Sequence, residues 1–258
     1  MNLIRAFLML NRNMIILVIP VMLDVAALAA GLSRVSFYGD PAPPFKIIFE
    51  TGLPSLSHIL EHPVLINTMK FAVYHQGPTL LTWLLIFVFI IVQSFFQGGF
   101  IHLLYVIAKG ESPAAYTFLS YCTRFGTRFF FLYFILLFFQ MSVVTLLALF
   151  LQYIGMFAAL AIFILLRILL IYFEFTLVIH HASFGEALKI SCQYFKHRIK
   201  ETYIALLSFF LVGGILGYAL HMFWSLKAVI AFIFIYAYIM TGIQLALMMS
   251  LVKIRELD

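Results

Sequence analysis

Residues 166–210 read LRILLIYFEFTLVIHHASFGEALKISCQYFKHRIKETYIALLSFF and decide the fold class. An apolar segment that contains Arg167 and Glu174 ends in a polar turn, a basic amphipathic segment follows, and a second apolar segment begins at once. An apolar segment of about 20 residues is long enough to cross a bilayer as a helix. The stretch therefore predicts two membrane-spanning helices joined by a basic elbow at the inner membrane surface.

The rest of the chain has a similar composition. Of its 258 residues, 65% are hydrophobic and 10% are charged. Because every backbone amide in a bilayer needs a partner inside the protein, long apolar runs of this kind form helices. We expect an all-α six-helix transmembrane bundle in a single integral membrane domain, residues 1–258, whose first span is not cleaved as a signal peptide. The expected spans are residues 14–31, 79–108, 129–153, 156–179, 202–221 and 228–252.

A short amphipathic segment precedes each of three outgoing spans. These segments begin near Met1, Ser112 and Ser183. The order amphipathic segment, outgoing span, returning span thus occurs three times and suggests three parallel helical hairpins with interfacial elbow helices. In the third segment, Ser183 and Glu186 fit the capping box of a helix start. This segment has an apolar stripe of Phe184, Leu188, Cys192, Phe195 and Ile199, and its basic residues Lys189, Lys196, Arg198 and Lys200 lie off the stripe.

Glycine residues mark places where helices are expected to bend or end. Gly98 and Gly99 lie where the second span would tolerate a bend. Gly126 can stop the elbow helix that begins at Ser112. Gly155 marks a tight outer turn between the third and fourth spans.

Residues 32–78 form the one long hydrophilic segment, an outer loop broken into short pieces by proline and glycine. Residues 55–62 and 64–75 are each expected to form a helix against the outer membrane face. Here His58, Glu61 and His62 match the pattern H-x-x-E-H, in which two histidines on one helical face bind zinc and the glutamate acts as a base. The following proline and the shortness of the loop disfavour an enzyme, so His58 and His62 are weak candidate metal ligands.

Lysine and arginine residues are unevenly distributed between the two ends of the spans. With both termini inside, the inner segments hold eleven of them and the outer segments hold four. This excess predicts cytoplasmic N- and C-termini in a multi-pass protein of the cell membrane. The inner residues are Arg5, Arg12, Lys109, Arg124, Arg128, Lys189, Lys196, Arg198, Lys200, Lys253 and Arg255, and the outer residues are Arg34, Lys46, Lys70 and Lys227.

Four polar residues interrupt the apolar runs. Asp24, Gln140 and Arg167 each fall near the middle of their span, and Glu174 lies two helical turns after Arg167. A charge at this depth costs a few kcal/mol and should face protein or water with a partner. Asp24 and Arg167 are therefore expected either to pair as a structural link between helices or to line a substrate or proton path. Glu174 is expected to contact the elbow or His102.

Gly213 and Gly217 form a G-x-x-x-G motif, which lets two helix backbones approach closely. The contact is expected within the chain, with a homo-oligomer as the alternative. The net charge of +6 is what cytoplasmic loops facing anionic lipid would give, and no basic-aromatic recognition module suggests a nucleic-acid partner. No cofactor is expected, because the sequence contains no phosphate loop, nucleotide motif or haem site.

Two stretches carry a family resemblance. Residues 97–130, QGGFIHLLYVIAKGESPAAYTFLSYCTRFGTRFF, and residues 174–198, EFTLVIHHASFGEALKISCQYFKHR, resemble a loose group of bacterial membrane proteins related to the membrane domain of some glycerophosphodiester phosphodiesterases. In that group an A-L-K-x-S core follows an aliphatic helix, and Ala187, Leu188, Lys189 and Ser191 match it. The resemblance implies a six-helix bacterial membrane protein. The soluble phosphodiesterase domain has no counterpart in this sequence, so that activity is not implied.

These observations lead to a ranked expectation of function. The first is a non-enzymatic protein of the bacterial cytoplasmic membrane that serves as an envelope- or transport-associated partner, because patterned sequence is concentrated in the basic elbows. Its basic elbows would meet anionic lipid or a soluble protein. The second is a transporter or exporter with a path through Asp24 and Arg167. A membrane zinc enzyme is third.

Overall fold

A computed structural model of the chain describes residues 3–32, 37, 51–60, 65 and 80–255. Within these ranges all regular elements are helices, which confirms the predicted all-α class. In chain order they are α1 (Leu3–Arg12), the 3-10 helix η1 (Met14–Leu17), α2 (Val18–Leu32), the 3-10 helix η2 (Leu56–His58), α4 (Leu80–Ala108), α5 (Ala115–Leu169), α6 (Phe173–Ile179), α7 (Phe184–His197), α8 (Ile199–Met222) and α9 (Leu226–Arg255).

Six helical segments are long and apolar enough to cross a membrane, and they confirm the predicted bundle. The fourth span is broken near its C-terminal end, so that α6 is a separate short helix. The third span is longer than expected because it is continuous with its elbow. The six segments are Met14–Leu32, Phe87–Ala108, Ala115–Gly155, Phe157–Ile179, Ile199–Met222 and Leu226–Lys253.

Gly126 does not end the second elbow, contrary to the prediction. α5 runs through this glycine as far as Gln152, where φ of 50° and ψ of −128° interrupt the helix. A Cβ on Gly126 would lie 3.4 Å from the Cα of Phe95 in α4. The glycine therefore lets two helices approach closely instead of ending one of them.

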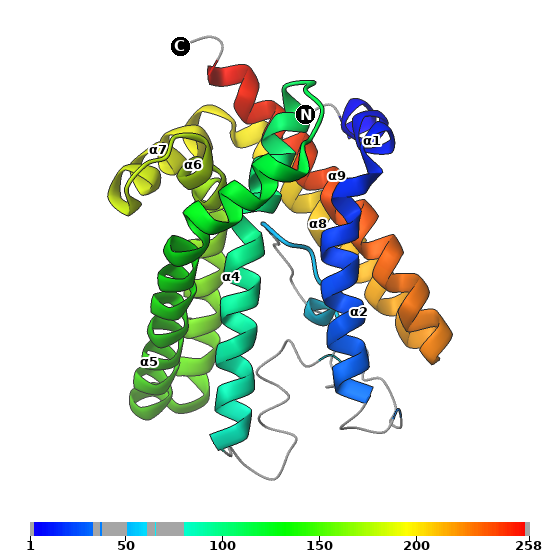
Figure 1. Ribbon diagram of the computed structural model, residues 1–258. Coiled ribbons are helices and arrows are strands. Elements are labelled where there is room, and N and C mark those ends of the chain that lie inside the picture. The colour runs from blue at the N-terminus through cyan, green and yellow to red at the C-terminus, as the bar shows by residue number, and fades with distance from the viewer. Residues whose placement is uncertain (1–2, 33–36, 38–50, 61–64, 66–79, 256–258) are drawn as a thin grey trace.

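The predicted tight turn at Gly155 is confirmed. It lies three residues after the interruption at Gln152, and a Cβ on Gly155 would collide with the carbonyl of Leu147. The chain reverses here, and the two halves of α5 run side by side (Figure 1).

Gly98 and Gly99 do not bend α4, which is helical from Leu80 to Ala108. A Cβ on Gly98 would lie 2.6 Å from the Cβ of Phe125, and one on Gly99 would collide with the Sγ of Cys122. Both glycines face α5, so their role is the same as that of Gly126. Close backbone approach supplies dispersion contacts, which drive helix association where the surrounding solvent is itself apolar.

The helices form two groups that meet near one end of the bundle (Figure 1). One group contains α4, α5, α6 and α7, and the other contains α1, α2, α8 and α9. The groups are joined mainly by packing of α4 against α9. At the other end the groups lie further apart in this view (Figure 1).

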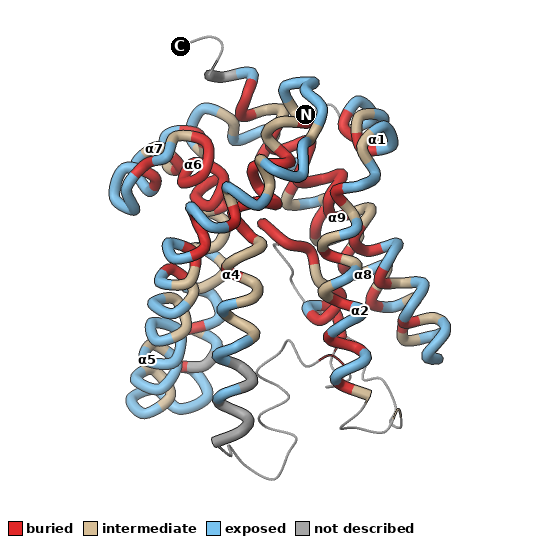
Figure 2. The backbone as a smooth tube through the Cα atoms, viewed as in Figure 1, coloured by how far each residue is buried: buried red, intermediate tan, exposed pale blue. Residues whose placement is uncertain are grey.

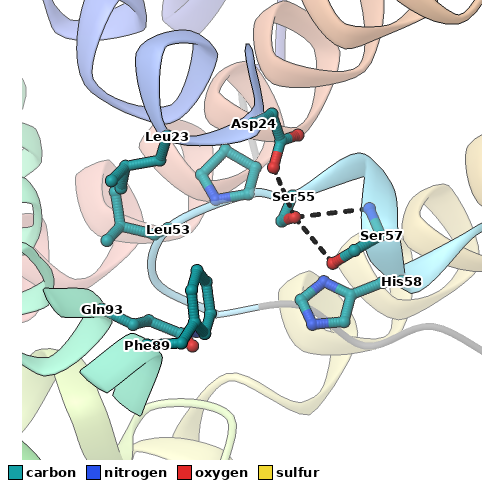
Figure 3. Close-up of a pocket in the computed structure, with 9 residues that line it drawn as sticks. Leu23, Asp24, Leu53, Ser55, Ser57, His58, Phe89 and Gln93 are labelled. Carbon is teal, nitrogen blue, oxygen red and sulfur yellow. Dashed lines mark hydrogen bonds between the residues drawn. The ribbon is translucent and has the colours of Figure 1, made fainter. Parts of the chain in front are cut away.

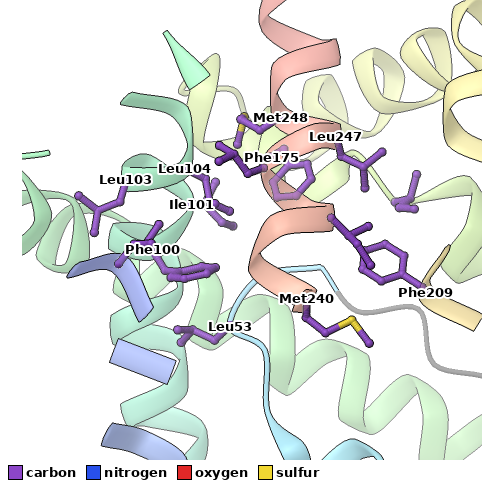
Figure 4. Packing of buried hydrophobic residues seen from close by; sticks show 14 of the residues in the cluster. Leu53, Phe100, Ile101, Leu103, Leu104, Phe175, Phe209, Met240, Leu247 and Met248 are labelled. Carbon is purple, nitrogen blue, oxygen red and sulfur yellow. The ribbon is translucent and has the colours of Figure 1, made fainter. Parts of the chain in front are cut away.

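Buried side chains are concentrated where the two groups meet (Figure 2). Phe100 and Leu104 of α4, Phe175 of α6 and Leu247 of α9 are fully buried there (Figure 4). In contrast, α5 presents large apolar side chains such as Phe150 outward. Outward-facing apolar residues are expected of a protein whose solvent is lipid, because apolar surface costs little there.

Helices α1 and α7 and the C-terminal part of α9 lie at the same end of the bundle (Figure 1). α1 rests on α9: Tyr238 donates a hydrogen bond of 2.8 Å from its hydroxyl to Asn11 Oδ1, and a Cβ on Gly242 would collide with the Phe7 ring. α7 buries Ala187, Ser191 and Tyr194. Of its predicted apolar stripe, Phe184, Leu188 and Ile199 are exposed, whereas Cys192 and Phe195 are half-buried and Phe195 packs against the core.

Candidate functional site

Residues 51–60 run into the interior of the bundle between the two helix groups (Figure 1). Leu53, Leu56, Ile59 and Leu60 are buried. The prediction of a helix over residues 55–62 against the outer face is therefore wrong for the described residues, since only Leu56–His58 form a short 3-10 helix and it is internal. We call residues 51–60 the inserted segment. Residues 61–64 and 66–79, which include most of the second expected loop helix, lie outside the described part of the chain.

The irregular backbone of the inserted segment is bound by side chains from three helices. Gly52 N donates to Gln244 Oε1 of α9 at 3.0 Å. Leu53 N donates to Gln97 Oε1 of α4 at 2.9 Å, and Leu56 N donates to Asp24 Oδ2 of α2 at 2.7 Å. Because non-helical backbone has no internal partners, these side chains replace the hydrogen bonds that a helix would make for itself.

A charged cluster lies at residues 51–53 of the inserted segment, which we call the tip. Arg167 Nη1 contacts Glu174 Oε1 at 3.0 Å, and Gln97 Nε2 donates to Glu174 Oε2 at 2.6 Å. The Arg167 Nη2 donates a longer bond of 3.5 Å to the carbonyl of Thr51. Glu174 is only 2% exposed. The break between α5 and α6 brings Glu174 within reach of Arg167, although the two lie seven residues apart.

A second cluster lies where the segment turns past α2 (Figure 3). Asp24 is 3% exposed, and its Oδ1 accepts a 2.6 Å hydrogen bond from Ser55 Oγ. Ser55 Oγ is also 2.7 Å from Ser57 Oγ. A cavity of about 20 Å³ adjoins these groups and is also lined by His58 and Gln93. A cavity of that size holds about one water molecule.

The structure gives Asp24 and Arg167 different partners. Asp24 binds Ser55 and Leu56, whereas Arg167 binds Glu174 and Thr51. The two charges therefore contact the same inserted segment at different points and are not each other's ion-pair partner. Gln140, the third polar residue at this depth, is exposed on α5 and does not join either cluster.

Glu174 contacts neither of its two expected partners, the elbow and His102, in the hydrogen bonds that the structure gives it. Its carboxylate oxygens instead bind Arg167 and Gln97. His102 stacks on Tyr121 of α5, with ring centroids 3.4 Å apart and planes 5° apart.

The zinc motif is only partly described. His58 is exposed at the end of η2, and Glu61 and His62 lie outside the described residues. No group of three or more His, Cys, Asp or Glu side chains able to hold a metal is found among the described residues. His58 lines the same small cavity as Ser57 and Asp24 (Figure 3).

The basic elbow α7 begins with the predicted capping box. Ser183 donates to Glu186 Oε2 from both its backbone N, at 2.9 Å, and its hydroxyl, at 2.8 Å. These hydrogen bonds lower the pKa of Glu186, because they stabilise the charged carboxylate. Lys189, Lys196 and Lys200 are exposed.

Three residues among the predicted basic elbow and helix-packing positions make contacts within the protein. Arg198 does not project freely, since its Nη1 contacts Glu201 Oε1 at 2.8 Å. Gly213 and Gly217 are buried on α8, whose main neighbour is α9, whereas a Cβ on Gly214 would meet open space. This burial agrees with a close contact inside the chain.

Sequence reasoning missed the residues that hold the tip. Gln97 and Gln244 are fully buried, as is Thr241 one helical turn before Gln244. The Thr51 hydroxyl, the Thr241 hydroxyl and Gln244 Nε2 are buried without a hydrogen-bond partner in the described structure. The sequence signal that could have identified Gln97 and Gln244 is a side-chain amide within an apolar run. Burying such an amide costs free energy unless it makes hydrogen bonds.

No family model matches this chain, and no curated protein or solved structure matches it either.

Proposed function

We propose that this membrane protein transports a small polar solute, and that the inserted segment lines the path. The observation behind the proposal is an irregular backbone segment placed among the spans and bound there by Asp24, Gln97 and Gln244. Irregular backbone at membrane depth is tolerated only where protein buries it or where it lines a water-filled cavity.

Polar groups at this depth support the same function. Asp24, Arg167 and Glu174 are ionisable residues inside spans, and such residues are rare unless they serve an ion or substrate path. Many transporters have broken elements near the membrane centre, where free backbone groups bind the solute. The segment supplies these groups, and buried Gln244 and Thr51 have spare hydrogen-bonding capacity beside it.

The arrangement of two helix groups also suits transport. The tip of the segment is bound by Gln97 of one group and Gln244 of the other, so a relative movement of the groups would change the environment of the tip. Rocking of one bundle against another around a central site is a common mode of alternating access.

Water access to the segment tests this function. In a Cys122→Ala/Cys192→Ala background, His58→Cys is treated in intact cells with a charged, membrane-impermeant thiosulfonate, and the reaction rate is measured. Phe138→Cys is the matched control, because Phe138 is exposed on the outside of α5 and would face lipid. We expect His58→Cys to react about tenfold faster or more, and the presence of a transported solute to slow it. Equal rates at the two positions would contradict an aqueous path.

The basic elbow favours a second function, that of an envelope-associated partner acting at anionic lipid. α7 exposes Phe184 and Leu188 together with Lys189 and Lys196, which is the pattern of a helix that lies at a membrane surface, and Lys200 at the start of α8 is exposed beside it in sequence. The orientation with cytoplasmic termini and the relation to the bacterial group described above are part of this proposal.

Lipid dependence separates the second function from the first. The test variant is Lys189→Glu/Lys196→Glu/Lys200→Glu, which leaves the Arg198–Glu201 pair intact. The wild type should have a higher Tm in nanodiscs with anionic lipid than in neutral ones, and the variant should lose this gain. Lys227→Glu, at the opposite end of the bundle, is the control. An equal gain in all three proteins would rule out a role for the elbow in lipid recognition.

A further inference from the structure

A hydrogen-bonded chain leads from a buried carboxylate toward an exposed imidazole. Ser55 has one hydroxyl proton and donates it to Asp24 Oδ1 at 2.6 Å. The bond of 2.7 Å between Ser55 and Ser57 must therefore have Ser57 as the donor. The hydroxyl protons of Ser55 and Ser57 are therefore both directed along the hydrogen-bonded path toward Asp24.

The end of the hydrogen-bonded path that is farther from Asp24 borders the small cavity. Ser57 and His58 both line it, and His58 is exposed whereas Ser57 is 3% exposed (Figure 3). Asp24 is also 3% exposed, whereas Ser55, between Ser57 and Asp24, is half-buried. The cavity is large enough for one water molecule between the imidazole and the Ser57 hydroxyl.

We propose that His58, Ser57 and Ser55 deliver a proton to Asp24, and that neutral Asp24 releases the inserted segment. This inference deepens the proposed transport function and rests on it for its purpose: the proton is the coupling ion, and the segment is the gate. The path is defined by the geometry of one cluster on α2 and the inserted segment.

The proton count balances along this path. The imidazolium of His58 gives one proton to Ser57 Oγ, directly or through one water molecule. Ser57 passes its original hydroxyl proton to Ser55 Oγ, and Ser55 passes its own to Asp24 Oδ1. Each serine ends with one proton, His58 is neutral, and Asp24 is a carboxylic acid. Both serine hydroxyls must rotate before a second transfer.

Protonation weakens the two bonds that hold the segment at α2. Leu56 N and Ser55 Oγ both donate to the Asp24 carboxylate, and hydrogen bonds to a charged acceptor are about twice as strong as neutral ones. When Asp24 is protonated at Oδ1, this oxygen becomes a hydrogen-bond donor. It then no longer accepts a hydrogen bond from the Ser55 hydroxyl. The tip remains bound by Gln97 and Gln244, so release occurs on the side of α2.

Few titratable groups surround Asp24 among the described residues. η2 contributes His58, and α4 contributes Phe89 and Gln93 to the cavity, neither of which titrates. α9, which packs against α2, has only tyrosines as titratable residues between Lys227 and Lys253. η1 has none. Among the described residues around Asp24, His58 is therefore the one with a side-chain type that commonly exchanges protons near neutral pH.

Release of the segment is measured at Leu53, which is 5% exposed and lines the cavity. Leu53→Cys is made in the Cys122→Ala/Cys192→Ala background, with and without Asp24→Asn. Modification by N-ethylmaleimide is followed in proteoliposomes at several pH values. The measured quantity is the rate with Asp24 divided by the rate with Asp24→Asn, because this ratio cancels the pH dependence of the thiol itself.

We expect this ratio to be about 0.1 or lower near pH 8 and to approach about 1 near pH 5. A ratio near 1 at both pH values, or one that stays low in acid, would overturn the proposal. If Asp24→Asn does not fold, Ser55→Ala takes its place: it removes one donor and should speed modification at high pH, with Leu188→Cys as the exposed reference. Unchanged protection in Ser55→Ala would then overturn the proposal.

The relay itself is tested by a rapid pH drop. Ser57→Ala interrupts the chain, so modification of Leu53→Cys should reach its acid rate several-fold more slowly than in the parent. Ser94→Ala, which removes a buried hydroxyl bonded only within α4, should leave the rate unchanged. Equal rates in Ser57→Ala and the parent would reject the relay. These readouts report segment release and not solute passage, so they can succeed where the water-access test at His58 fails.

Discussion

Glu174 is a buried charged residue, so substitution of its partners should be costly. Its carboxylate is almost fully buried, and it is satisfied by a guanidinium on one oxygen and an amide on the other. Arg167 is less buried, with a side chain 35% exposed. Removing one partner of a buried pair is strongly destabilising because the remaining charge is left without compensation. The loss should therefore be greater when Arg167 is neutralised than when Glu174 is.

A double-mutant cycle measures this pair. Arg167→Gln should lower the free energy of unfolding by about 2 kcal/mol, below the range for fully buried pairs because the arginine is partly exposed. Adding Glu174→Gln should recover about 1 kcal/mol or more of that loss. Chemical denaturation in detergent provides the values. The same cycle with Asp24→Asn and Arg167→Gln should be additive within about 0.5 kcal/mol. Strong coupling in this second cycle would mean that Asp24 and Arg167 are direct partners after all.

Gly52 provides a separate test of the inserted segment. Its φ is +98°, and a Cβ there would collide with the Gln97 amide. Gly52→Ala should therefore destabilise the protein by about 2 kcal/mol or more, since it strains the backbone and displaces Gln97. Gly214→Ala is the matched control: its Cβ meets open space in a helix, so it should stabilise by about 0.5 kcal/mol. The two Tm values, measured under the same conditions, should shift in opposite directions.

The sequence identifies the intramembrane charges but not their partners. Asp24 and Arg167 stand out because each interrupts an apolar run, and a charge at that depth has a large cost. Their partners Ser55 and Thr51 lie in a loop whose composition resembles that of an exposed linker. Contacts between distant parts of the chain leave no periodic signal, so the insertion of this loop could not be predicted from local patterns.

At the scale of elements, helix starts are more predictable than helix packing. The capping box of α7 is a local hydrogen-bond pattern, and it was predicted and found at Ser183 and Glu186. Glycines are ambiguous, because the same residue permits a bend, an end or a close contact. Gly155 lies at a turn, whereas Gly99 and Gly126 lie at the contact between α4 and α5. Only the partner helix decides between these roles.

The capping box makes the start of α7 dependent on pH. The folded pKa of Glu186 is lowered by the Ser183 hydrogen bonds, so the stabilisation is present above the unfolded pKa and is lost as pH falls through the folded one. Glu186→Ala should speed hydrogen exchange of residues 186–189 at neutral pH relative to the wild type. This difference should disappear in acid, below the folded pKa. Comparing both proteins at each pH removes the intrinsic pH dependence of exchange, and a difference that persists in acid would contradict the assignment.

At the scale of the molecule, the inserted segment links the two helix groups. Direct contact between the groups is mainly that of α4 with α9, and Gln97 and Gln244 bind adjacent residues of the segment from these same two helices. A change in the distance between α4 and α9 would therefore alter the two hydrogen bonds that hold Gly52 and Leu53. The six spans follow from length and hydrophobicity alone, whereas this linkage depends on how the spans are arranged around the loop.

The orientation of the whole bundle determines which compartment the segment faces. α1, α7 and the C-terminal part of α9 share one end, and most lysine and arginine residues belong to segments at that end. Positive charge is retained on the cytoplasmic side during insertion, so we expect Lys227, at the start of α9, to face the outside. In the background without native cysteines, an impermeant maleimide should label Lys227→Cys in intact cells and Lys200→Cys only after permeabilisation. Both lysines are exposed, so accessibility within the protein is matched. Labelling of Lys200→Cys in intact cells would mean that the bundle has the opposite orientation. In that case protons would reach His58 from the cytoplasm.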